Sequence, residues 1–239
     1  MLEVSNVSKI YKTAKGRICA LERISFNVEK GERIGVFGHA ASGKSTLIRL
    51  LGGVELPTTG KIVRRMSVSW PVGLRGCFQP KLTGYQNIHF FANIYGRGDA
   101  ELTEAIRDIS ELGHRLSDPV GTYSAVMRAK LSFALSLAVE FDCYLIDGAV
   151  GAGDRKFLQK CRRWLLETHS DKSLVLASNK PRLIQQFCDR VILLTSGRMV
   201  ESLPVQKGWQ QTAIKLLQNP TDDGNLHGDD RLFKLSDRR

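Results

Sequence analysis

This 239-residue chain has few cysteines, and no two of them form a C-x-x-C pair. The five are Cys19, Cys77, Cys143, Cys161 and Cys188. A scattered, odd-numbered set with apolar neighbours argues against a disulfide framework and against a thiolate metal site, so we expect buried, reduced thiols. The five histidines do not cluster either, and they give no sign of a metal site.

Long hydrophobic runs are also missing. No stretch of about 18 apolar residues occurs, so the sequence predicts no membrane-spanning helix. The first residues, MLEVSNVSKIYK, lack the apolar segment of a signal peptide. If the protein works at a membrane, we expect it to lie beneath that membrane.

Acidic residues are fewer than basic ones, 24 against 35, which gives a net charge of +11 and a pI near 9.6. This excess favours an anionic partner, such as nucleotide phosphates, nucleic acid or the cytoplasmic face of a membrane. A generally basic, solvated surface explains it equally well. The basic residues do not alternate with aromatic ones, as they would in a single-strand nucleic-acid binder.

The pattern along the chain predicts an α/β fold. Short apolar or alternating stretches predict strands within 2–11, 24–38, 60–70, 143–147, 173–178 and 191–202, and apolar spacing predicts helices within 44–54, 82–139, 181–190 and 209–218. A strand, a Gly-rich turn, a helix and further buried strands are typical of a nucleotide-binding domain. We divide the chain into a core (1–81), an inserted helical subdomain (82–139), a second core segment (140–205) and a short helix with a polar, mobile tail (206–239).

One motif carries the chemistry. Gly38, Gly43, Lys44 and Ser45 fit the phosphate-loop pattern G-x-x-x-x-G-K-[ST]. In such a loop the backbone N–H groups and the N-terminus of the following helix surround the phosphates, the lysine reaches the outer phosphates and the hydroxyl binds Mg²⁺. The predicted nucleotide ligands are Gly38, His39, Ala40, Ala41, Ser42, Gly43, Lys44, Ser45 and Thr46. At Ala41 a glycine would take a positive φ more freely, so we expect reduced affinity.

The phosphate loop and the helical insert resemble the ATP-binding subunit of an ABC transporter, from the N-terminus to about Glu201. The resemblance implies a P-loop ATPase fold with a mixed sheet, and ATP and Mg²⁺ as cofactors. It implies four roles: Tyr11 stacks on adenine, Gln79 contacts Mg²⁺ and the attacking water, Asp147 holds Mg²⁺, and Ser124 contacts the ATP of a second subunit. Asp154 would lie in the loop that crosses the dimer interface.

Several stretches of the sequence point to one subfamily within the ABC superfamily. LIRLLGGVELPTTGKI, MSVSWPVG, FQPKLTGYQNIHFFANIYG and SLAVEFDCYLID are similar to the ATPases of capsular polysaccharide exporters. This implies a subunit at the cytoplasmic face of the inner membrane, paired with an integral membrane permease and with a second ATP-binding subunit in a homodimer or heterodimer. The related O-antigen exporters usually carry a carbohydrate-binding domain after the ATPase, and we expect none here.

Three positions depart from the family's pattern. Gly148 stands where the family has the glutamate that acts on water, and Asn179 stands where it has a histidine at the γ-phosphate. Val126 replaces the glycine of Ser-x-Gly in the signature segment, where close approach to a phosphate is needed. The residues that would bind MgATP are mostly kept, and the residues that would catalyse its hydrolysis are mostly lost. We therefore expect weak ATP hydrolysis.

Glu140 and His169 precede their strands and should lie at the wrong end of the sheet to replace the lost groups, whereas His39 lies inside the phosphate loop. The alternatives are an inactive nucleotide-binding subunit or scaffold paired with an intact ATPase, and a soluble ABC-type regulator acting on nucleic acid or the ribosome. Such regulators usually have two ATPase domains or a long coiled coil, so a nucleic-acid partner is the weaker hypothesis.

Overall fold

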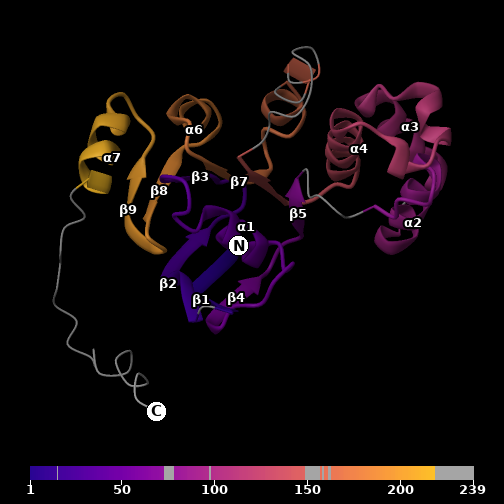
Figure 1. The fold of residues 1–239 in the computed structure, drawn as a ribbon. Helices are drawn as coiled ribbons and strands as arrows, with labels where there is room; N and C mark the ends of the chain where they lie inside the picture. The colour runs from indigo at the N-terminus through magenta and orange to yellow at the C-terminus, as the bar shows by residue number, and fades with distance from the viewer. Residues whose placement is uncertain are drawn as a thin grey trace.

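The structure, a computed structural model, describes residues 1–14, 16–72, 78–96, 98–148, 157, 159–160 and 163–218 (Figure 1). Its strands are β1 (Leu2–Thr13), β2 (Gly16–Val28), β3 (Arg33–Phe37), β4 (Thr59–Arg64), β5 (Val68–Val72), β6 (Cys143–Asp147), β7 (Ser173–Ser178), β8 (Arg190–Thr195) and β9 (Arg198–Pro204). Its helices are α1 (Lys44–Leu51), α2 (Gly84–Tyr95), α3 (Asp99–Ser110), α4 (Ala125–Ala138), α6 (Pro181–Phe187) and α7 (Trp209–Gln218). Short helical turns are η1 (Gly113–Ser117), η2 (Val120–Thr122) and η3 (Trp164–Thr168).

The larger sheet has the strand order β5-β6-β7-β3-β8-β9, parallel except for β9. All residues of β3 and β7 are buried, as expected of central strands covered on both faces. Phe37 pairs with Ser178, and Asp147 pairs with Ala177. The carboxyl ends of β3, β6 and β7 therefore meet at one edge of the sheet, where ligands bind in open α/β folds.

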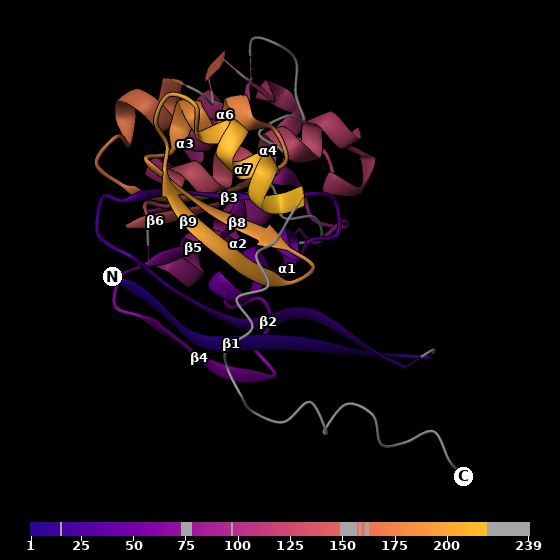
Figure 2. The same cartoon turned by 90° about the vertical axis from the view of Figure 1, so that its left-hand side faces the viewer.

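The smaller sheet is antiparallel, with the order β2-β1-β4. Figure 2 shows it below the larger sheet, while most of the helices cover the opposite face. Helix α1 lies between the two sheets, and five of its eight residues are buried. The helix that follows Gly43 is thus fixed by apolar packing on both sides, which holds its N-terminus in place.

Helices α2, α3 and α4 are grouped beside the β5 end of the larger sheet (Figure 1). Both α2 and α4 begin at a side-chain cap. Thr83 and Gln86 form a reciprocal capping box at α2, and Ser124 Oγ accepts a hydrogen bond from Met127 N at α4. The helical character expected for 82–139 is confirmed, with the interruptions η1 and η2 between α3 and α4.

Two expectations need correction. The stretch 60–70 is not one strand: β4 joins the smaller sheet and β5 joins the larger one, because the chain crosses between the layers at 65–67. Cys143 and Cys188 are buried free thiols, but Cys19 is exposed on the β2 ribbon, so the expectation of burial is wrong there. Cys77, Cys161 and the tail after residue 218 lie outside the described residues.

Among the residues that the structure describes, no helix has the length and hydrophobicity to cross a membrane.

Candidate functional site

Two glycines shape the loop between β3 and α1. A Cβ on Gly38 would lie 2.1 Å from the carbonyl oxygen of Leu194. This distance is too short for any side chain at position 38. Gly43 has a φ of +101°, and a Cβ there would lie 2.5 Å from the carbonyl oxygen of Ala20. Backbone packing against β8 and β2 therefore requires glycine at both positions, independently of any ligand.

Ala41 has a φ of +61°, in the left-handed region. An L-residue with a Cβ takes this conformation at a cost of about 1–2 kcal/mol. A glycine would take this conformation more freely, so the reduced nucleotide affinity expected at Ala41 stays a prediction.

Lys44 folds back over the loop. Its Nζ donates to the carbonyl oxygen of Gly38 at 2.9 Å, to that of His39, and to Ser42 Oγ at 3.2 Å. Burial lowers the pKa of the ammonium, and the charge of Asp147 opposes that shift. The Lys44 ammonium therefore brings positive charge to the loop, where an anionic group such as a phosphate would bind.

Ser45 and Asp147 meet although they are far apart in the sequence. Ser45 Oγ, in the first turn of α1, donates to Asp147 Oδ1 at the end of β6 over 3.1 Å. A hydroxyl and a carboxylate are the hard oxygen donors that Mg²⁺ uses when phosphates and water complete its shell. The pair therefore fits a magnesium ion held between the loop and the neighbouring strand.

Gly148 follows Asp147 with a φ of +60°, and its N–H donates to the carbonyl oxygen of Ala177 at 2.7 Å. A Cβ at this position would meet only that oxygen, at 3.9 Å. Space is thus available for a side chain, but the backbone conformation disfavours one. Asn179 is exposed directly after β7, at the same sheet edge as Gly38.

Tyr11 lies on β1, paired with Ile18 of β2. Its hydroxyl donates to Glu55 Oε2 at 2.6 Å and accepts from Arg49 Nη2 at 3.1 Å. The same Nη2 donates to Thr46 Oγ1 at 3.2 Å, which connects Tyr11 to the phosphate-loop helix through two hydrogen bonds. Sequence reasoning missed Arg49 and Glu55, since neither belongs to a motif and only the fold brings them together.

Gln79 is exposed, and its backbone is held by Asn87 of α2. Asn87 Oδ1 accepts from Gln79 N at 2.9 Å, while its Nδ2 donates to three carbonyl oxygens of the same turn. Residues 73–77, just before Gln79, lie outside the described part of the chain, as does Asp154. The structure thus fixes the Gln79 backbone, whereas its role at Mg²⁺ stays a prediction.

Ser124 and Val126 begin α4, on the far side of the molecule from α7 (Figure 1). The Ser124 hydroxyl is used as a helix cap, and the Val126 side chain is 45% exposed. That Ser124 contacts the nucleotide of a second subunit stays a prediction.

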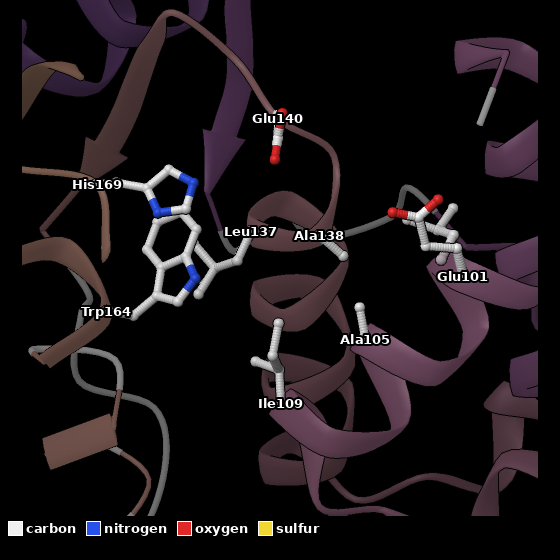
Figure 3. Close-up of a pocket in the computed structure, with 9 residues that line it drawn as sticks. Glu101, Ala105, Ile109, Leu137, Ala138, Glu140, Trp164 and His169 are labelled. Carbon is white, nitrogen blue, oxygen red and sulfur yellow. The ribbon is translucent and has the colours of Figure 1, made fainter. Parts of the chain in front are cut away.

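Glu140 and His169 lie together away from the phosphate loop. They line a hollow of about 200 Å³ with Trp164, on which the His169 ring stacks at 3.6 Å (Figure 3). Burial lowers the pKa of His169. Because both residues precede the first residue of a strand, this hollow is at the opposite end of the sheet from Asp147, as the sequence indicated. His39 is exposed in the loop.

Comparison with known proteins agrees with this geometry. The family described as "ABC transporter" matches residues 21–151. The capsule polysaccharide export ATP-binding protein CtrD of Neisseria meningitidis is 46% identical over 88% of this chain and 97% of its own length. The ATP-binding protein BexA of Haemophilus influenzae is 44% identical over the same shares, and the polysialic acid transport ATP-binding protein KpsT of Escherichia coli is 35% identical over 84% and 90%.

A solved structure has the same fold. The ATP-binding cassette MJ0796, in a dimeric post-hydrolysis state bound to ADP and Pi, superposes with a TM-score of 0.74 at 21% identity, over 86% of this chain and 99% of that one. The matched region contains the phosphate loop and Asp147, and the relatives align over almost their full length. This chain therefore belongs to the ABC transporter family, as one of its ATP-binding subunits.

Proposed function

We propose that this chain powers or gates the export of capsular or another cell-surface polysaccharide. Relatives that cover most of the chain are described as capsule or polysialic acid export proteins, and this supports the substrate class. The observation that carries the nucleotide role is the 3.1 Å contact of Ser45 with Asp147 beside a correctly spaced phosphate loop.

The bound species in this proposal is MgATP. Lys44 exchanges the carbonyl oxygens of Gly38 and His39 for the outer phosphates, and Ser45 and Asp147 hold the magnesium ion, which neutralises phosphate charge. Gln79 completes the polar contacts at the outer phosphate, and Tyr11 stacks on the base. Thr46 and the loop residues His39, Ala40, Ala41, Ser42 and Gly43 surround the phosphates.

Hydrolysis is slow in this proposal because no carboxylate follows Asp147. A positioned general base contributes about 10²–10⁴ in rate, and a contact on the transferring phosphoryl group about 10²–10³. Gly148 supplies no base. Asn179 can still donate a hydrogen bond to the γ-phosphate, so nucleotide binding is less impaired than hydrolysis. ATP therefore favours a long-lived dimer, as far as Val126 allows Ser124 to approach the second subunit's nucleotide.

The partners are an integral membrane permease and a second ATP-binding subunit, identical or intact in its catalytic groups. The location is the cytoplasmic face of the inner membrane, where the net charge of +11 favours an anionic surface. An intact partner in a heterodimer would supply the carboxylate that this chain lacks at one of the two composite sites.

Complementation tests this function. The chain is expressed with its own permease in a capsulated strain that lacks its capsule export ATP-binding protein. Wild-type protein should restore surface polysaccharide and co-purify with the permease, whereas Lys44→Ala should co-purify without restoring export. Lys61→Ala, an exposed lysine on β4, is the control. Binding to RNA or ribosomes without a membrane protein would instead support the regulator.

A further inference from the structure

A partly buried polar network surrounds the Tyr11 hydroxyl. Glu55 is its centre: Oε2 accepts from the Tyr11 hydroxyl at 2.6 Å and lies 3.3 Å from Lys9 Nζ, while Oε1 accepts from Arg49 Nε at 2.6 Å. The Glu55 side chain is only 23% exposed. Two cations and a hydroxyl therefore converge on one carboxylate, and each of its oxygens has a partner.

Electrostatics favour the charged form of this network. Burial raises the pKa of Glu55, but the hydrogen bonds from Tyr11, Arg49 and Lys9 outweigh that effect and hold the pKa below its ordinary value. Burial likewise lowers the pKa of Arg49, and its bonds to Tyr11 and Glu55 raise it further than burial lowers it. Charge-assisted hydrogen bonds of this kind are short and directional, so they fix the geometry of the groups they join.

The network touches both halves of the nucleotide site. At one end the Tyr11 hydroxyl is held as a donor to Glu55, which restricts the rotation of its ring. At the other end Arg49 Nη2 donates to Thr46 Oγ1, in the helix that follows the phosphate loop. Thr46 is buried, and the helix is packed between the two sheets, so this end is rigid.

We propose that Glu55 and Arg49 are positioning residues for the base half of the nucleotide site. They do not touch the nucleotide. They hold the Tyr11 ring at a fixed place relative to Thr46, so that a base and a triphosphate chain fit at the same time. This inference rests on the proposed function, in which Tyr11 stacks on the base of ATP. An ordered ring spares the loss of side-chain freedom on binding, and affinity rises by about three- to tenfold.

The test compares ATP with inorganic tripolyphosphate, which has no base. Affinities for both, with Mg²⁺, are measured by titration calorimetry for Tyr11→Phe, which keeps the ring and removes the hydroxyl, and for Glu55→Gln. Each variant should bind ATP about three- to tenfold more weakly and tripolyphosphate within about twofold of wild type. The loss in the double variant should be smaller than the sum of the two single losses, because both changes act on the Tyr11–Glu55 contact.

The chain offers a matched control in Glu32. Its carboxylate accepts from Arg190 Nε at 2.7 Å and its side chain is 23% exposed, as at Glu55, but it precedes β3 at the opposite end of the sheet. Glu32→Gln should change neither affinity. If Glu55→Gln weakened the affinities for ATP and for tripolyphosphate equally, the proposal would be overturned, because the network would then support the phosphate loop as a whole.

Tyr11→Ala separates this inference from the proposed function. If it weakens ATP binding while Tyr11→Phe and Glu55→Gln do not, the ring binds the base without help from the network, and the positioning role is wrong. If Tyr11→Ala binds ATP like wild type, the base site itself is wrong. Should Glu55→Gln fail to fold, Tyr11→Phe decides, since it removes a single hydroxyl group.

Discussion

Lys44 illustrates how one side chain serves two states of the phosphate loop. In the structure its ammonium donates hydrogen bonds to the carbonyl oxygens of Gly38 and His39. Phosphate oxygens offer this cation stronger acceptors, because they carry full negative charge. In the proposed function this exchange of carbonyl for phosphate oxygens favours nucleotide binding, so we expect binding to depend on this lysine.

Lys44→Ala should weaken MgATP binding by about 1.5–3 kcal/mol, the value of one charge-assisted hydrogen bond, or roughly ten- to a hundredfold. Titration with a fluorescent ATP analogue measures this loss, with Lys61→Ala as the control for removal of a surface charge. Equal affinity of Lys44→Ala and wild type would reject the assignment of the loop.

In the proposed function, the missing carboxylate at Gly148 is the main reason for slow hydrolysis. With a φ of +60°, Gly148→Glu should cost about 1–2 kcal/mol of stability. This change alone should raise turnover only modestly, because Asn179 and Val126 remain. Combined with Asn179→His and Val126→Gly, it should raise turnover by a factor on the order of 10², the low end of a general base's contribution. Steady-state phosphate release measures both variants.

The control for this restoration is Gly148→Gln in the same background. It has the same backbone strain and nearly the same volume, but no carboxylate. Turnover as high with glutamine as with glutamate would show that the gain does not come from a base. Wild-type turnover at the level of relatives with a complete site would place the catalytic groups elsewhere.

At the scale of elements, α2 fixes the segment that carries Gln79. Asn87 is 2% exposed, and it closes the turn with hydrogen bonds to the backbone of Gln79, Leu82 and Thr83. The helix therefore begins from a rigid turn instead of an open loop.

Asn87→Ala should lower the free energy of unfolding by about 1–3 kcal/mol, because buried backbone groups lose their partner. It should also reduce the ATPase rate by releasing Gln79. Urea denaturation and phosphate release measure the two effects, with Asn93→Ala, an exposed asparagine of the same helix, as the control. A loss of stability without any change in the ATPase rate would show that Gln79 has no role in hydrolysis.

At the scale of the whole molecule, the described part of the chain offers no helix that could span a membrane, and the net charge is +11. In the proposed function the chain attaches to a permease and to anionic lipid, and salt should weaken the lipid contact because it screens surface charges beyond about 10 Å at 0.1 M. This predicts different behaviour in cells with and without the permease.

Cell fractionation should find the protein in the membrane pellet when the permease is present, and a carbonate or high-salt wash should release it. In a strain without the permease most of the protein should be found in the supernatant. Retention in the washed pellet of that strain would contradict peripheral attachment. The permease-bound fraction of Lys44→Ala serves as the control for a folded but inactive protein.

The sequence by itself determined the phosphate loop and most of the elements. Gly38, Gly43, Lys44 and Ser45 are adjacent in the chain, so their spacing alone encodes the turn and the helix start. The buried strands at 143–147 and 173–178 and the helix at 209–218 agree with the structure because local hydrophobic patterns report burial directly. The missing carboxylate at Gly148 was equally visible, since it is one residue from an identifiable strand end.

Only the tertiary structure decided which distant residues meet. The Ser45–Asp147 contact joins the first turn of α1 to the end of β6, and the Tyr11–Glu55–Arg49 network joins β1 to the end of α1. No local sequence pattern predicts either contact, because the order of the strands and the packing of the layers set the distances between these residues. The positive φ at Gly148 and the split of 60–70 between two sheets are likewise imposed by neighbouring strands, and no single stretch of sequence encodes them.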